Sequence, residues 1–156
     1  MLTIEVQSQA VQAKLAQLQH QTENLQPVFE SVGQGLRTLI IDCFEQEKSP
    51  DGINWAALSP VTTKHRHGSS HQILNDTGKL KNSIDSPSSI VATNSYVELT
   101  TDSVYAAMMN FGGTKAQFPH LWGDIPARPF FPTEILPQNW EVEILDVINA
   151  HLQIQP

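Results

Sequence analysis

Residues 125–131, Ile-Pro-Ala-Arg-Pro-Phe-Phe, restrict the fold more than any other stretch of this chain. Pro126 and Pro129 each lock φ at about −65° and lack the backbone N–H that a helix or sheet would use. Each proline also disfavours helical geometry in the residue before it, here Ile125 and Arg128. The segment is therefore predicted to be a rigid connector, outside helix centres and inner strands, that holds the Arg128 side chain in one pose.

Composition excludes several classes of protein. The chain has 156 residues, 40% of them hydrophobic, so we expect a single domain over residues 1–156. Its formal net charge of −7 argues against nonspecific DNA binding, which needs a dense basic surface to displace counterions. We expect no specific nucleic-acid binding either. The one cysteine, Cys43, allows no intrachain disulfide. Because neither a secretory signal nor an apolar run of about 20 residues is present, we expect no membrane association.

Apolar residues recur at helical spacing in several parts of the chain. A helix is predicted over residues 8–22, after a short strand at 2–6, and a second helix begins at Pro27. Two more helices are predicted over residues 103–110 and 138–152. The second helix carries Val28, Val32, Leu36, Leu39, Ile40, Cys43 and Phe44 on one face, and the last carries Trp140, Ile144, Leu145 and Ile148.

Alternating residues predict a small sheet in the second half of the chain. Three short strands are expected at residues 81–85, 90–92 and 96–100, joined as an antiparallel meander. The fold class is therefore predicted as α+β, with a small antiparallel sheet packed against helices. Residues 48–80 open with the turn Ser-Pro-Asp-Gly and are predicted to be a mostly irregular loop, a length that is usually functional in a small domain.

Three histidines in this loop suggest an alternative function. His65, His67 and His71 could serve a small metal-dependent hydrolase, because histidine is the commonest metal ligand. However, no cysteine or carboxylate lies close by at a recognised ligand spacing. The favoured interpretation is a solvated loop, and we expect neither a metal nor another cofactor.

Other candidate catalytic groups have simpler explanations. Cys43 lies in an apolar stripe, where a small buried hydrophobe is the ordinary interpretation. Asp76 beside Gly78 resembles a turn or cap residue. Residues 75–80 lack the first glycine of a phosphate-binding loop, and Leu80 replaces its hydroxyl residue. We therefore expect no enzymatic activity.

Large side chains in the irregular segments are candidates for protein contacts. Trp55 and Leu58 either pin the long loop to the core or meet another subunit. Phe130 and Phe131 leave the same two possibilities open, because aromatic residues dominate both cores and interfaces. Arg128 either caps a nearby helix, pairs with a carboxylate of its own chain, or has a role between subunits. Arginine forms planar pairs with carboxylates well, so the expected counter-charge is a carboxylate of its own chain or of a neighbouring subunit.

Four segments occur in the order and spacing of one protein family. They are Phe44-x5-Pro50-Asp51-Gly52-x2-Trp55-x2-Leu58-Ser59-Pro60-x-Thr62, Ile73-Leu74-Asn75-Asp76-Thr77-Gly78-Lys79-Leu80-x2-Ser83-Ile84, Tyr105-Ala106-x4-Phe111-Gly112-Gly113, and Ile125 to Phe131. Over about residues 25–150 the chain resembles the phage virion morphogenesis family, the small tail-completion proteins of Mu-like and P2-like phages. The candidate interaction residues are Trp55, Leu58, Tyr105, Phe111, Arg128, Phe130 and Phe131.

One position departs from the family pattern. Family members often carry a histidine shortly before the Phe-Gly pair, where this chain has Met109. This difference weakens any chemical role for that histidine here. Methionine is a flexible apolar residue and suits a contact surface better.

The resemblance implies a structural or assembly protein of a tailed phage or prophage, acting in tail completion or head–tail joining through protein contacts. It implies a fold like that of neck and tail-terminator proteins, which often work as rings and in many cases as hexamers. Other tail or neck proteins are the implied partners, and the host cytoplasm is the implied place of assembly. If the protein stays in the finished particle, the implied location is the virion tail or neck.

Overall fold

A computed structural model describes residues 20, 23–67, 71–133 and 135–153. The strand predicted over residues 2–6 and, apart from residue 20, the helix predicted over 8–22 lie outside the described residues. The elements in chain order are α2 (Gln26–Gln46), α3 (Pro60–Lys64), α4 (Lys79–Asp85), the 3-10 turn η1 (Pro87–Ser89), β1 (Ile90–Ala92), β2 (Val97–Leu99), α5 (Ala106–Phe111) and α6 (Gln138–Gln153). Helices and a small antiparallel sheet confirm the predicted α+β class.

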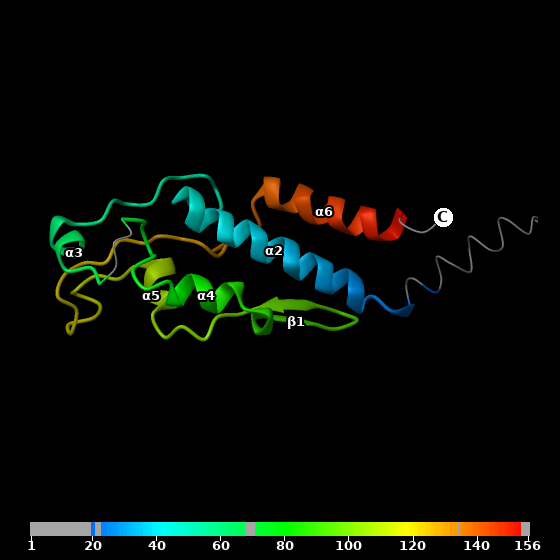
Figure 1. Cartoon of the computed structure of the whole chain (residues 1–156), viewed down its shortest axis with the longest axis horizontal. Helices are drawn as coiled ribbons and strands as arrows, with labels where there is room; N and C mark the ends of the chain where they lie inside the picture. The colour runs from blue at the N-terminus through cyan, green and yellow to red at the C-terminus, as the bar shows by residue number, and fades with distance from the viewer. Residues whose placement is uncertain (1–19, 21–22, 68–70, 134, 154–156) are drawn as a thin grey trace, which may run out of the picture.

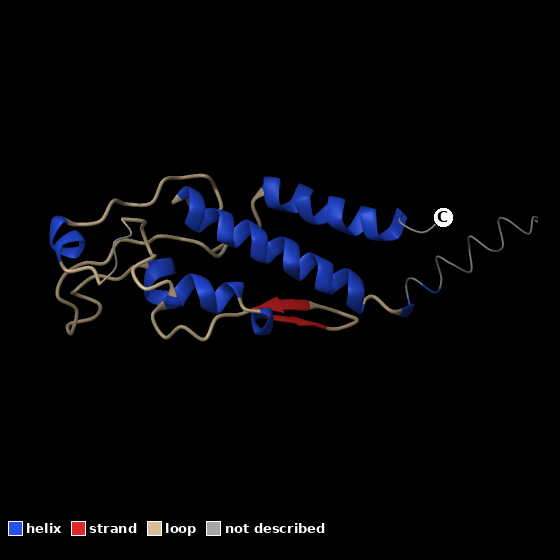
Figure 2. Cartoon of the chain, viewed as in Figure 1, coloured by secondary structure: helices blue, strands red, loops and turns tan. Residues whose placement is uncertain are grey.

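Helix α2 is the centre of this arrangement. It runs between α6 on one side and the β1–β2 hairpin with α4 on the other (Figures 1 and 2). Pro27 lies in its first turn, as predicted, where the missing N–H has no helical partner to lose. The helix ends at Glu47, which adopts a left-handed conformation with φ 54°. Its buried stripe comprises Val28, Val32, Ile40, Cys43 and Phe44, with Leu36 and Leu39 partly buried against the core.

The hairpin and α6 contact α2 where its residues are small. A Cβ on Gly33 would lie 2.6 Å from Ile90 Cγ2 and 2.9 Å from Val97 Cγ2, so the hairpin packs directly on the helix backbone. A Cβ on Gly35 would meet Val147 of α6 at 3.7 Å, an ordinary contact. Leu145, which was predicted for the inner face of α6, is instead half exposed.

The strand predicted over residues 81–85 is wrong, because these residues belong to helix α4. Leu80 and Ile84 are buried while Asn82 between them is exposed. A strand would place all three on one face, whereas helical spacing puts only the two apolar residues together. The sheet therefore has two strands among the described residues, with Ile90 opposite Leu99, instead of a three-stranded meander.

The loop predicted over residues 48–80 is mostly irregular but contains the short helix α3. The hydroxyl of Ser59 caps this helix by accepting from the Thr62 N–H at 3.1 Å. The predicted turn at residues 49–52 forms, with the Gly52 N–H donating to the Ser49 carbonyl at 2.8 Å. The helix predicted over 103–110 is α5, and no helix of the described chain is long and apolar enough to cross a membrane.

Candidate functional site

The proline segment lies outside every helix and outside the β1–β2 sheet, as predicted. Side chains and main-chain groups from distant parts of the chain hold it in place. The Arg128 N–H donates to the Met109 carbonyl at 2.9 Å, and the Trp55 indole N–H donates to the Pro129 carbonyl at 2.8 Å. The connector therefore rests on α5 and on the long loop together.

Arg128 is bound within its own chain. Its side chain is 8% exposed; Nε donates to the Ala56 carbonyl at 2.8 Å and Nη2 to the Ala57 carbonyl at 3.1 Å. Among the described residues it makes no ion pair with a carboxylate. The expected carboxylate partner is therefore not found in the described part of the chain, where main-chain carbonyls take its place. Burial lowers the pKa of the guanidinium, which still remains charged at neutral pH.

Trp55 and Phe130 lie in the core. The Phe44 ring of α2 contacts both, with ring centroids 5.5 Å from Trp55 and 5.2 Å from Phe130. Phe131 and Leu58 are partly buried and pack against the same cluster. These contacts pin both irregular segments to α2, which is one of the two possibilities that the sequence left open.

Tyr105 and Phe111, the other two candidate interaction residues, face solvent. Phe111 is 64% exposed and Tyr105 is 40% exposed. Both belong to the segment that forms α5, whose inner side carries the buried Ala106 and Asn110. The structure thus divides the candidate interaction residues into those that pack within the fold and those whose side chains are exposed to solvent.

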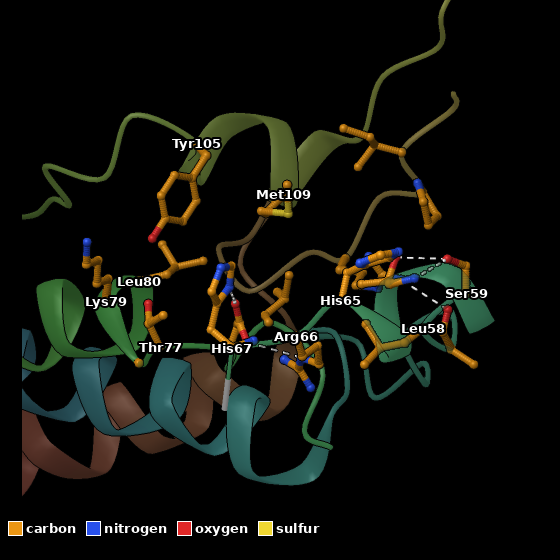
Figure 3. Close-up of a pocket in the computed structure, with 18 of the residues that line it drawn as sticks. Leu58, Ser59, His65, Arg66, His67, Thr77, Lys79, Leu80, Tyr105 and Met109 are labelled. Atoms are coloured by element: carbon orange, nitrogen blue, oxygen red, sulfur yellow. Dashed lines mark hydrogen bonds and ion pairs between the residues drawn. The ribbon is translucent and has the colours of Figure 1, made fainter. Parts of the chain in front are cut away.

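The four family-like segments border one hollow of about 720 Å³ beside Arg128. Figure 3 shows Tyr105, just before α5, and Met109 of α5 on one side of it, and Thr77, Lys79 and Leu80 around the start of α4 on another. Leu58, Ser59, Thr62, His65, Arg66 and His67 from the long loop complete the lining together with residues of the proline segment. Segments separated by tens of residues in sequence therefore share one site.

Asp76 organises one wall of the hollow. Its Oδ1 accepts from the His67 backbone N–H at 3.0 Å, and its Oδ2 lies 3.1 Å from His67 Nδ1. The Arg66 guanidinium is 3.6 Å from the same carboxylate. The carboxylate thus joins residues 66–67 to the segment before α4.

The three histidines do not come together as a metal centre. His65 and His67 line the hollow, whereas His71 is exposed and does not line it. The part of the chain that the structure describes holds no group of three or more His, Cys, Asp or Glu side chains placed to bind a metal.

Cys43 of α2 is buried in the core. Desolvation, reinforced by the negative charge of Asp42, raises the pKa of this thiol to about 12. The thiolate is the nucleophilic form of cysteine. Cys43 therefore stays protonated at neutral pH and behaves as a buried apolar residue, as the stripe pattern predicted.

Asn110 was missed by the sequence analysis. Its side chain is 3% exposed, and its Oδ1 accepts from the Phe130 and Phe131 N–H groups, each at 2.9 Å. The one available signal was an amide residue on the apolar side of a short helix, just before the Phe-Gly-Gly motif. Nothing in the sequence indicated that its partners follow 20 residues later.

In chemical terms the hollow combines apolar and charged groups. Its walls combine the apolar side chains of Leu58, Leu80 and Met109 with the cationic Lys79. Such a mixture suits the uptake of an apolar or aromatic side chain from another molecule.

No curated protein and no solved structure matched the chain. A family model described as the phage virion morphogenesis family matches residues 6–153. The match extends beyond residues 25–150, for which the resemblance was expected, and includes all four segments around the hollow. The chain therefore belongs to the phage virion morphogenesis family.

Proposed function

We propose that this protein completes tails or joins heads to tails in a tailed phage or prophage, through protein contacts and without catalysing a reaction. Family membership supports a role in building virions. The specific assembly step is our proposal. We further propose that residues 1–156 form one domain.

One observation carries the proposal. The four family-like segments meet at a single hollow, where the polar groups of Asp76 and Arg128 hold the walls and Tyr105 is open to solvent. A surface of this kind, with rigid walls and exposed aromatic side chains, is suited to docking. We therefore assign the hollow and the adjacent Phe111 as the region that contacts partners.

The proposed partners are other tail or neck proteins and further copies of this chain. A ring of copies, for example a hexamer, requires two different patches that fit each other and close on themselves. Tyr105 and Phe111, with the partly buried Leu58 and Phe131, would make contacts. The contact residues would be held in position by the buried Trp55, Arg128 and Phe130. Assembly would take place in the host cytoplasm, with the tail or neck as the final location.

Deletion of the gene from an inducible prophage tests this function. We expect filled heads and separate tails that fail to form stable infectious particles, as seen by electron microscopy and plaque titre. Complementation with a Tyr105→Ala, Phe111→Ala double variant should restore the titre poorly. A control at an exposed apolar residue outside the hollow, Ile53→Ala, should restore it fully. Blocked DNA replication or packaging with normal tails would contradict the assignment.

A further inference from the structure

Trp122 is the most exposed large apolar residue described in this chain. Its side chain is fully exposed, whereas Trp55 and Trp140 are 6% and 3% exposed. An indole held in water forgoes the burial that usually stabilises it. Tryptophan is also among the residues that most often dominate binding energy at protein interfaces. The position of Trp122 is therefore typical of an anchor that awaits a partner.

The segment that carries Trp122 is built as a closed loop. Gly113 and Ile125 exchange N–H···O hydrogen bonds of 2.9 and 2.8 Å at its base. Within it, the Lys115 N–H donates to Asp124 Oδ1 at 2.8 Å, and the Phe118 N–H donates to the Thr114 carbonyl at 2.9 Å. Because this loop is already ordered, docking it costs less conformational entropy than docking a flexible segment.

The hollow has the size and chemistry to receive an indole. Its volume of about 720 Å³ exceeds what one tryptophan side chain needs and lies in the ordinary range of ligand pockets. Met109 offers a sulfur for contact with an aromatic ring. Lys79 offers a cation for the indole face. Tyr105 can pack beside the inserted ring.

The charge distribution favours a second copy of this chain as the source of the indole. The lining of the hollow carries three Lys or Arg side chains against two carboxylates, in a chain of net charge −7. A second acidic copy is therefore not repelled by a local excess of carboxylates when it approaches the hollow. Because Trp122 is fully exposed, it does not fill the hollow of its own chain.

We propose that Trp122 of one copy inserts into the hollow of another copy. The loop of residues 113–125 and the hollow together form the self-assembly contact of this protein. This inference rests on the proposed function, for which it supplies the contact between copies.

The chain contains a specific probe for this contact. Of its three tryptophans, Trp122 alone is open to an aqueous quencher. We expect acrylamide to quench a large part of the fluorescence at low protein concentration. Protection should then rise with concentration in step with the mass measured by sedimentation equilibrium.

Variants identify the two sides of the contact. Trp122→Ala should weaken the association constant about 30-fold or more, as loss of a hot spot does. Trp122→Phe should retain most of the association, and Tyr105→Ala on the receiving side should weaken it about tenfold. Ile135→Ala changes another largely exposed apolar residue that does not line the hollow, and it should leave association unchanged. Equal melting curves would show that all variants remain folded.

Three results would overturn the inference. They are a monomer with accessible Trp122 over the whole concentration range, unchanged association in Trp122→Ala, and protection of Trp122 only after another tail or neck protein is added. Each would leave the proposed function standing, because the prophage deletion tests that function separately. If deletion of the gene blocked replication or packaging instead, the proposed assembly role would be wrong. Concentration-dependent shielding of Trp122 could still be observed in that case, so the two failures are distinguishable.

Discussion

Two regions of this molecule are stabilised in different ways. The helical region, made of α2, α4, α6 and the β1–β2 hairpin, is held by apolar side chains packed around α2. The loop region comprises residues 47–78 and 101–137, and its described residues form only two helices, the short α3 and α5. There, polar side chains bind the main chain of distant segments, as Arg128 and Asn110 do.

This difference has a physical origin. Buried backbone groups need hydrogen-bond partners, and helices and sheets supply them within the element. The prolines of the loop region prevent that solution, so side chains supply the partners instead. The result is an irregular surface with fixed walls, which is what a binding hollow requires. Four variants test whether the two regions depend on each other and on these separate forces.

Phe130→Ala is expected to have the largest effect. Phe130 comes from the loop region, is 0% exposed and packs against Phe44 of α2. Removing its ring should lower the free energy of unfolding by about 3–5 kcal/mol, measured by urea denaturation. The matched control Phe111→Ala removes an exposed ring and should cost less than about 1 kcal/mol. Equal small losses in both variants would mean that the loop region does not depend on α2.

Asn110→Ala tests side-chain hydrogen bonding in the loop region. The change leaves the Phe130 and Phe131 N–H groups without their acceptor. Each unsatisfied buried donor costs roughly 1–3 kcal/mol, so a loss of at least about 2 kcal/mol is expected. Amide hydrogen exchange at both phenylalanines should also accelerate. The exposed Asn139 serves as the control, and a neutral Asn110→Ala would show that water readily replaces the amide.

Arg128→Ala should lower the free energy of unfolding by about 2 kcal/mol. Each hydrogen bond to a charged group is worth roughly 1.5–3 kcal/mol. Removal of the buried charge offsets part of that loss. Thermal melting measures this loss. Arg128→Lys should restore part of it, since one ammonium can reach one of the Ala56 and Ala57 carbonyls. Unchanged stability combined with failed assembly would instead assign Arg128 to a contact between subunits.

Cys43 provides a pH-dependent test of burial in the helical region. Burial raises the pKa of this thiol to about 12 in the folded protein, above an unfolded value of about 8.5. The stability that the buried, protonated thiol contributes is therefore fully present below the unfolded pKa. As pH rises toward the folded pKa, the free energy of unfolding falls by up to about 1.4 kcal/mol per pH unit. Cys43→Ala should lack this part of the alkaline slope. Identical slopes in both proteins would contradict burial of the thiol.

Regular local patterns predicted the helical region well. The apolar stripe of α2, its start at Pro27 and the hairpin strand Ile90–Ala92 follow from periodicity and turn chemistry, which involve near neighbours only. The error at residues 81–85 came from a window of five residues, too short to distinguish a helical period from a strand. The second hairpin strand was placed correctly but is shorter than predicted, Val97–Leu99.

The loop region was predicted less completely. Its irregularity and the position of the proline connector were expected, but the burial of Trp55 and Phe130 was only one of two possibilities. The roles of Asp76 and Asn110 depend on groups that come from other segments of the chain. The fully exposed Trp122 carried no sequence signal that separated it from a core tryptophan.

By itself, the sequence determined the α+β class, the course of α2 and membership in the phage virion morphogenesis family, which the ordered motifs indicated and the family match confirmed. These properties follow from φ restrictions and periodicities that act along the chain. Only the tertiary structure decided that Arg128 binds the Ala56 carbonyl, 72 residues away, and that the four motifs enclose one hollow. Hydrogen bonds and packing depend on distance in space, and that distance exists only once the chain has folded around α2.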